Sequence, residues 1–147
     1  MNFIISRIFV ITLLILLADC VHSQWFPKNS GTINELKSVQ FFDENTGFIC
    51  GRNLLLKSSD GGQSWQNNFL PGNHNRLFFS GNNIGYICSD SGRVYKTSNG
   101  GANWILQNTN TIRDLTSIKF INAQTGIVTG KDRTFMKTTN GGSTWIN

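Results

Sequence analysis

Short alternating and apolar stretches along the chain predict β-strands. Ser38–Phe41 alternates polar and apolar residues with a period of two, as expected of a strand with one buried face. A polar turn, Asp43–Gly47, follows, and we expect its glycine to supply a positive φ. The mostly apolar Phe48–Cys50 is typical of a strand covered on both faces, and Leu54–Lys57 supplies a third strand. Residues 24–147 lack helical periodicity, so the pattern predicts an all-β fold.

One eight-residue sequence motif, called the phrase below, occurs three times, over Ser58–Trp65, Thr97–Trp104 and Thr138–Trp145. The tryptophans stand at positions 25, 65, 104 and 145, so the period is 40, 39 and 41 residues. A fixed period of this length indicates an array of one small unit. Four short strands per unit is the pattern of a β-propeller blade, whose two apolar faces must stack on neighbours.

We therefore predict a β-propeller segment of three four-stranded antiparallel blades, over about residues 24–65, 66–104 and 105–147. Closed propellers typically have about four to eight blades, so three blades predict an incomplete ring. A truncated product is one explanation. The other is self-association through open blade faces, for instance two chains making six blades, because such faces would otherwise expose apolar surface.

The phrase is expected to clamp the hairpin between the third and fourth strands of each blade. Its Asp or Asn should accept hydrogen bonds from amides two residues on, its glycines permit unusual backbone angles, and its Trp fills space between blades. One such side chain per turn supplies too few oxygen ligands for Ca²⁺, so we predict no metal and no cofactor. The structural set is Ser58, Asp60, Gly62, Ser64, Trp65, Thr97, Asn99, Gly101, Trp104, Thr138, Asn140, Gly142, Thr144 and Trp145.

Residues 1–23 have the features of a signal peptide. The apolar run over 8–18 is shorter than the roughly 20 residues that span a bilayer, and cleavage is expected before Gln24. A lipid anchor on Cys20 is an alternative, although Asp19 stands where a lipobox has a small residue. An uncleaved anchor is another. We predict a secreted, periplasmic or cell-surface protein.

The charge and the cysteines limit the choice of partner. Thirteen basic and eight acidic residues give a net charge of +5 at pH 7, without a run of cations. For an exported chain this favours an acidic partner or an anionic surface over nucleic acid. Cys50 and Cys88 occupy the same place in successive repeats, which in a stacked array is too far apart for a disulfide. We expect buried free thiols, with a disulfide or a reactive or metal site as alternatives.

The phrase closely resembles the Asp-box of bacterial-neuraminidase-type repeats, and its three near-complete copies make the resemblance specific. The compact period and the pattern Val-x-Phe…Gly-Phe/Tyr-Ile…Lys-Ser/Thr-x-Asp/Asn-Gly-Gly look most like photosystem II assembly/stability-factor-type propellers, which also occur as exported bacterial proteins. The resemblance covers the whole of residues 24–147. It implies a non-catalytic scaffold that holds a protein partner.

Asp-box propellers also include sialidases. Sialidases resemble one another in having a cluster of three arginines, a Tyr nucleophile with a Glu partner, and an Asp acid/base. Here Tyr86 and Tyr95 fall within strands of the middle blade, Asp43 and Glu44 are adjacent turn residues, and His74 is without a recognisable triad. We predict no catalytic residues and no enzyme. The alternatives are a fragment of a glycan-binding or glycoside-hydrolysing propeller and a structural repeat segment of a large cell-surface protein.

The arginines after residue 24 are predicted to share one end of the blades, opposite the Asp-boxes. The turns between the second and third strands carry Arg52, Arg93 and Arg133, and the loops before the first strands carry Lys28, Arg76 and Arg113. The guanidinium fork suits carboxylates and protein interfaces, which makes this basic face the candidate contact surface. The alternative is that these cations lie in exposed turns and are neutralised by Asp90, Asp114 and Asp132.

Overall fold

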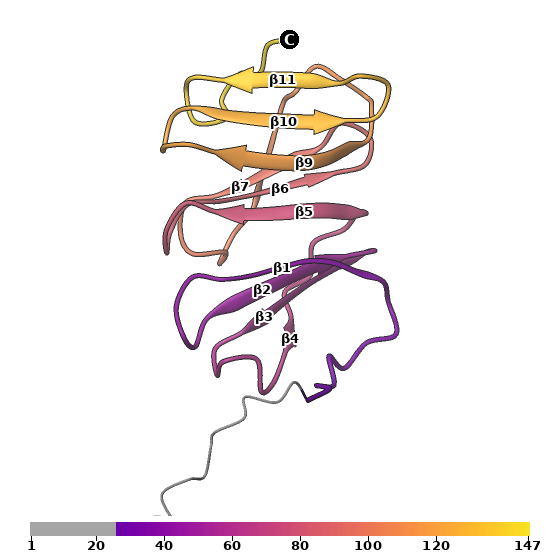
Figure 1. Cartoon of the computed structure of the whole chain (residues 1–147), viewed down its shortest axis with the longest axis vertical. Coiled ribbons are helices and arrows are strands. Elements are labelled where there is room, and N and C mark those ends of the chain that lie inside the picture. Colours follow the sequence, from indigo (N-terminus) through magenta and orange to yellow (C-terminus); the bar gives the residue numbers. More distant parts are fainter. Residues whose placement is uncertain (1–25) are drawn as a thin grey trace, which may run out of the picture.

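Residues 26–147 form three antiparallel β-sheets stacked along one axis (Figure 1). The computed structural model describes these residues, so the expected signal peptide, the lipid-anchor alternative at Cys20 and Trp25 lie outside them. The strands are β1 (Leu36–Phe41), β2 (Gly47–Gly51), β3 (Leu54–Ser58) and β4 (Gln66–Asn67) in the first sheet; β5 (His74–Phe79), β6 (Gly85–Ser89), β7 (Val94–Thr97) and β8 (Ile105–Gln107) in the second; and β9 (Leu115–Phe120), β10 (Gly126–Gly130) and β11 (Phe135–Thr138) in the third.

Each sheet is a meander in which neighbours in sequence are neighbours in space. In the third sheet an isolated bridge between Lys137 and Ile146 stands where a fourth strand would lie. The described residues thus confirm an all-β stack of propeller blades, and the three blades do not close a ring (Figure 1). β4 and β8 begin directly after the phrase tryptophan, so the first two sheets extend past the predicted limits at residues 65 and 104.

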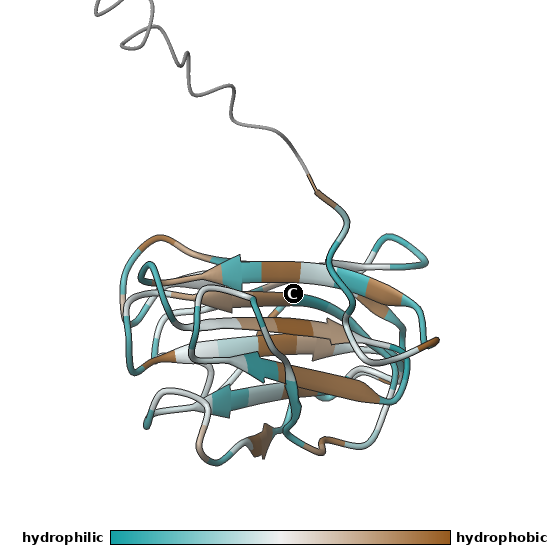
Figure 2. Ribbon diagram, turned by 90° about the horizontal axis from the view of Figure 1, so that it is seen from below, coloured by the Kyte–Doolittle hydropathy of each residue, from teal (hydrophilic) through white to brown (hydrophobic). Residues whose placement is uncertain are grey.

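The second strands of the first two blades are buried on both faces, as expected from their apolar runs. Every residue of β2 and β6 is buried, whereas β10 is partly exposed. Phe48 and Cys50 of β2 pack against the second blade, and Ile49 packs on Leu54, Leu56 and Trp65 of its own blade. Figure 2 shows apolar residues gathered on the strands, whereas the turns at the two ends of the sheets are mostly polar.

The glycine that opens each second strand serves a different purpose from the one predicted. Gly47, Gly85 and Gly126 are absent from the residues with positive φ. Gly126 instead pairs with Phe120 across the sheet, and a Cβ at Gly126 would lie 2.7 Å from the Phe120 ring. The first two blades repeat this arrangement. Glycine is needed there because the phenylalanine ring lies over its backbone.

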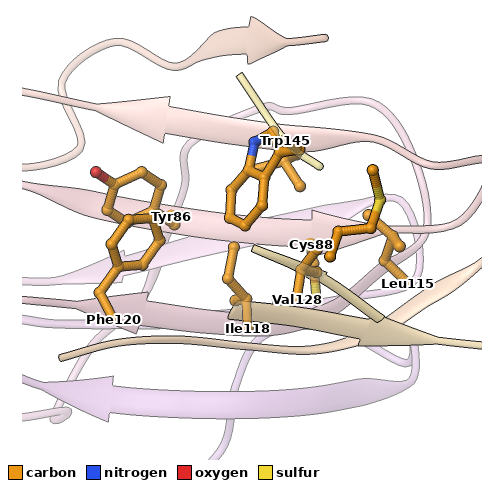
Figure 3. Close-up of a cluster of buried hydrophobic side chains, with 9 residues drawn as sticks. Tyr86, Cys88, Leu115, Ile118, Phe120, Val128 and Trp145 are labelled. Atoms are coloured by element: carbon orange, nitrogen blue, oxygen red, sulfur yellow. The ribbon is translucent and has the colours of Figure 1, made fainter. Parts of the chain in front are cut away.

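The core consists of the layers between blades. Between the second and third blades, Tyr86 stacks on Phe120 with ring centroids 3.8 Å apart, and Trp145 meets Phe120 edge-on at 5.9 Å (Figure 3). Between the first and second blades, Phe48 stacks on Phe79 at 5.1 Å. Aromatic pairs of this kind add about 0.5–1.5 kcal/mol beyond the burial of their area.

Both cysteines of the described chain are free and buried, as predicted. Cys50 lies in the layer between the first and second blades, and Cys88 in the layer between the second and third. Burial raises the pKa of each thiol to about 12, so both are protonated and unreactive at neutral pH.

Candidate functional site

The Asp-box turns connect the third strand of each blade to its outer edge. In the first turn, Ser58 Oγ donates to Asp60 Oδ1 at 2.8 Å and accepts from the Gly62 amide at 2.8 Å. Asp60 accepts from the Ser64 amide at 2.9 Å and from Ser64 Oγ at 2.6 Å. The Asp60 carboxylate thus bonds to the residue four positions ahead, and not to an amide two positions ahead as predicted from the sequence.

The second and third turns repeat this network with an amide in place of the carboxylate. Asn99 Oδ1 accepts from the Thr97 hydroxyl and the Asn103 amide, both at 2.9 Å. Asn140 Oδ1 does the same with Thr138 and Thr144. Each phrase tryptophan packs edge-on against the phenylalanine of its own first strand. In all three turns the Ser or Thr and the Asp or Asn side chains are occupied by bonds within the turn itself.

Acid is expected to weaken the first turn selectively. Hydrogen bonds from the Ser64 hydroxyl, the Ser64 amide and Ser58 lower the pKa of Asp60 from 3.8 to about 2. Because the folded state depresses this pKa, the stabilisation is fully present above pH 3.8 and is lost as the pH falls towards 2. The melting temperature of Asp60→Asn should therefore lie below that of the wild type at neutral pH, with the gap closing between about pH 4 and 2. A gap that stays constant with pH would contradict this assignment.

The strand ends opposite the Asp-box turns carry most of the predicted basic face. We define the arginine end as the turns 52–53, 90–93 and 131–134 with the loops 68–73 and 108–114. Contacts hold these segments together: Arg52 forms a bridge with Asn73, the Asp90 amide donates to the Asn73 carbonyl, and the Lys131 amide donates to the Asp114 carbonyl. Arg52, Arg93, Arg113 and Arg133 all lie in these segments.

Two predicted members of the basic face are not part of this end. Arg76 lies in the middle of β5, opposite Cys88, and not in the loop before that strand. The prediction failed because the strand begins at His74, whose buried imidazole takes the place of an apolar residue in the pattern. Lys28 lies in the extended segment before β1, and within residues 26–147 it has no side-chain hydrogen bond or salt bridge that joins it to the arginines.

The carboxylates at the arginine end are all engaged. Arg113 binds Asp132 at 2.7 Å and Lys131 binds Asp114 at 2.8 Å, and Asp90 accepts from the side-chain amides of neighbouring asparagines. The Lys131 ammonium and the Ser91 amide hold the pKa of Asp114 below its usual value. Among the predicted cations, neutralisation therefore applies to Arg113, while Asp114 pairs with Lys131, which the prediction did not include.

Arg52, Arg93 and Arg133 remain available. All three are exposed, and within residues 26–147 none has a side-chain hydrogen bond or salt bridge. Two adjoining depressions of about 440 and 360 Å³ lie at this end; Arg133 lines the first, Arg93 the second, and Thr111 both. The surface thus offers free guanidinium groups beside shallow hollows, a geometry suited to a peptide with carboxylates.

Tyr86 and His74, two of the residues considered for catalysis, are held by contacts within the fold. The Tyr86 hydroxyl is buried and donates to the Gly141 carbonyl at 3.1 Å, and burial raises its pKa to about 12. The buried His74 bonds through its two ring nitrogens to Ser89 Oγ and the Leu70 carbonyl, and burial lowers its pKa. Residues 26–147 contain no cluster of three or more His, Cys, Asp or Glu able to hold a metal ion. Within the same range, no helix has the length and apolar character needed to cross a membrane.

Comparison with known proteins agrees with this architecture. Residues 22–119 match the family described as "Photosynthesis system II assembly factor YCF48". The photosystem II assembly lipoprotein Ycf48 of Synechococcus sp. (strain CC9902) is 37% identical in an alignment of 68 residues that covers 43% of this chain and 20% of the relative. The chloroplastic photosystem II stability/assembly factor HCF136 of Oryza sativa subsp. japonica is 33% identical in an alignment of 91 residues that covers 54% of this chain and 22% of the relative.

A solved structure described as YCF48 bound to D1 peptide shares the fold, with a TM-score of 0.71 and 22% identity over 79% of this chain and 41% of that chain. The chain spans about a fifth of the length of the curated relatives it matches. The family match covers more than half of the chain and includes two of its three Asp-box phrases. The chain therefore belongs to the family of the photosynthesis system II assembly factor YCF48.

Proposed function

We propose that this chain is an exported, non-enzymatic propeller scaffold that holds an acidic segment of a protein partner at its arginine end. The observation that carries the proposal is the set of three exposed arginines, Arg52, Arg93 and Arg133, which have no partner within residues 26–147. Guanidinium groups bind carboxylates in bidentate fashion. Since the carboxylates at this end are already engaged, a partner has to supply new ones.

The relatives support a binding role. Both curated relatives are named as photosystem II assembly factors, and one solved structure of the fold is described as bound to a D1 peptide. A propeller of this fold that is bound to a peptide agrees with a surface of free hydrogen-bond donors on this chain. One relative is named a lipoprotein and the other chloroplastic, which supports the proposal that this chain too is exported.

Reversing the three free charges is expected to abolish binding of an acidic peptide. The probe is a fluorescein-labelled peptide of alternating glutamate and serine, compared with its glutamine counterpart by fluorescence anisotropy. The combined Arg52→Glu, Arg93→Glu and Arg133→Glu variant should bind the glutamate peptide at least about tenfold more weakly, because each exposed pair contributes up to about 1 kcal/mol and reversal adds repulsion. Wild-type affinity should also fall with added salt.

A variant with the same change in net charge provides the control. Arg76→Glu, Lys119→Glu and Lys137→Glu alter exposed cations outside the arginine end. This variant should retain the wild-type affinity within about threefold, since only a long-range charge effect remains. If both variants lost the same affinity for the glutamate peptide, the attraction would depend only on the net charge of the chain and not on the arginine end. Equal binding of the glutamate and glutamine peptides would contradict carboxylate recognition altogether.

A further inference from the structure

Side chains of the first blade accept hydrogen bonds from edge amides of the second. β1, β5 and β9 are edge strands of their sheets and lie side by side along the stack (Figure 1). At the junction of β1 and β5, the Leu77 amide donates to Ser38 Oγ at 3.3 Å. The Phe79 amide donates to Gln40 Oε1 at 3.0 Å, and Gln40 Nε2 donates to the Phe79 carbonyl at 3.1 Å. The free edge of β5 is thus supplied with acceptors by β1.

The junction of β5 and β9 has different side chains at the same places. On β5, Arg76 stands at the place that Ser38 has on β1. Phe78 likewise stands at the place of Gln40. A guanidinium group has only donors, and a phenyl ring has no oxygen or nitrogen that could accept. The second blade therefore cannot supply the edge of β9 with acceptors in the way that the first blade supplies β5.

The Ile118 amide on β9 is left without an acceptor as a result. The Ile121 amide donates to the Thr125 carbonyl across the turn to β10 at 3.0 Å, and the amides of an antiparallel strand point alternately to its two sides. The Ile118 amide therefore points to the free edge of β9, as the Leu77 amide does on β5. Within residues 26–147 no side chain or carbonyl accepts from it, and Ile118 is only 2% exposed. Buried amides without a partner are rare, which indicates an acceptor from outside the chain.

Two cations line the same hollow as Ile118. This hollow of about 430 Å³, which we call the inner groove, is lined by residues 38–40 of β1, 76–78 of β5 and 117–119 of β9. The lining includes the exposed Arg76 and Lys119 and no carboxylate. Within residues 26–147 Arg76 has no side-chain hydrogen bond or salt bridge, and Lys119 Nζ lies 4.6 Å from the centroid of the Phe78 ring. The groove thus combines free positive charge with an unpaired backbone donor.

We propose that the inner groove binds a small inorganic oxyanion, such as phosphate or sulfate, between the Arg76 guanidinium and the Ile118 amide. Guanidinium groups and backbone amides both form strong, charge-assisted hydrogen bonds to oxyanions. The Lys119 ammonium adds a second positive charge on the strand that carries the amide. At this junction the anion takes the place that the Ser38 hydroxyl has at the first. All of these donors lie on two adjoining blades of the described chain, apart from the arginine end.

An NMR titration with phosphate, followed at individual backbone amides, tests the site. In Tris chloride buffer, phosphate should move the Ile118 amide proton downfield in a saturable way, because the amide gains a charged acceptor. Arg76→Met keeps the aliphatic stem and removes the guanidinium, so it should bind phosphate at least about tenfold more weakly. Arg93→Met is the matched control, since it removes the same charge at the arginine end, and it should bind within about threefold of the wild type.

Arg76→Ser tests why the amide is unpaired. It restores on β5 the hydroxyl that Ser38 has on β1, so the Ile118 amide should exchange its hydrogen more slowly than in Arg76→Met and should no longer respond to phosphate. A wild-type Ile118 amide that does not respond to phosphate would overturn the proposal. Equal weakening by Arg76→Met and Arg93→Met would also overturn it, because it would show only a general attraction of anions to a basic chain.

The inner groove and the arginine end are separated by a variant already described. The combined Arg76→Glu, Lys119→Glu and Lys137→Glu variant is expected to keep the glutamate peptide, but it should lose phosphate binding because two of its substitutions lie in the inner groove. Loss of the peptide together with phosphate would contradict two separate sites. Failure of the wild type to bind the peptide, with phosphate binding intact, would overturn the proposed function and leave the inner groove supported.

Discussion

Replacing Phe120 by alanine is expected to lower the free energy of unfolding by about 3–5 kcal/mol, the usual cost of deleting a buried phenylalanine ring. Phe120 is 4% exposed and contacts both Tyr86 and Trp145 in the layer that joins the second and third blades (Figure 3). Its removal would also uncover the backbone of Gly126, over which the ring lies. Urea denaturation followed by tryptophan fluorescence measures the loss.

Phe41→Ala is the matched control, because Phe41 occupies the same place in the first blade but is 39% exposed. It still meets Trp65 edge-on at 5.8 Å, so a smaller loss of about 1–2 kcal/mol is expected from the reduced burial. Equal losses at the two positions would show that the contact with a preceding blade adds nothing to the stability of Phe120.

Gly101→Ala is expected to destabilise the junction of the first and second blades by about 2–5 kcal/mol, the sum of a left-handed backbone and overpacking. Gly101 has a φ of +80° within the second Asp-box, and a Cβ there would collide with the Phe48 ring. Phe48 is fully buried and stacked on Phe79, so it has little room to move. Thermal unfolding by circular dichroism measures the effect.

Gly31→Ala separates the two causes. Gly31 has a φ of +72°, but a Cβ there would meet nothing within 4 Å, so only the backbone strain of about 1–2 kcal/mol is expected. A Gly101→Ala loss no larger than that of Gly31→Ala would contradict the assigned clash. The pair tests whether the second glycine of the Asp-box is required by its backbone angle alone or also by the neighbouring blade.

The repeat made the blades predictable, because strand period, turn residues and the recurring phrase agree at each level. Local chemistry was predicted less well. The glycine that opens each second strand was expected to serve a turn, but it pairs across the sheet with a phenylalanine on the preceding strand. The Asp-box side chains were expected to bond two residues on, whereas the two tandem glycines carry the chain round so that the bond closes at the fourth residue.

The candidate site was predictable only in part, for a similar reason. Arg52, Arg93 and Arg133 could be placed at one end because a meander sends every turn of the same kind to the same end. Whether a given cation is free depends on contacts between segments far apart in sequence, such as Arg113 with Asp132 and Lys131 with Asp114. Such pairs leave no periodic signal in the sequence.

By itself, the sequence determined the all-β class, the three blades and the clamp at each outer hairpin, because these follow from short-range patterns repeated at a fixed period. Tertiary structure alone decided which arginines are free and which equivalent side chains are buried. Val39, Leu77 and Ile118 occupy the same position of one repeat, yet only the last two are covered. Burial depends on whether another blade packs against that face, and a repeated sequence motif carries no information about this.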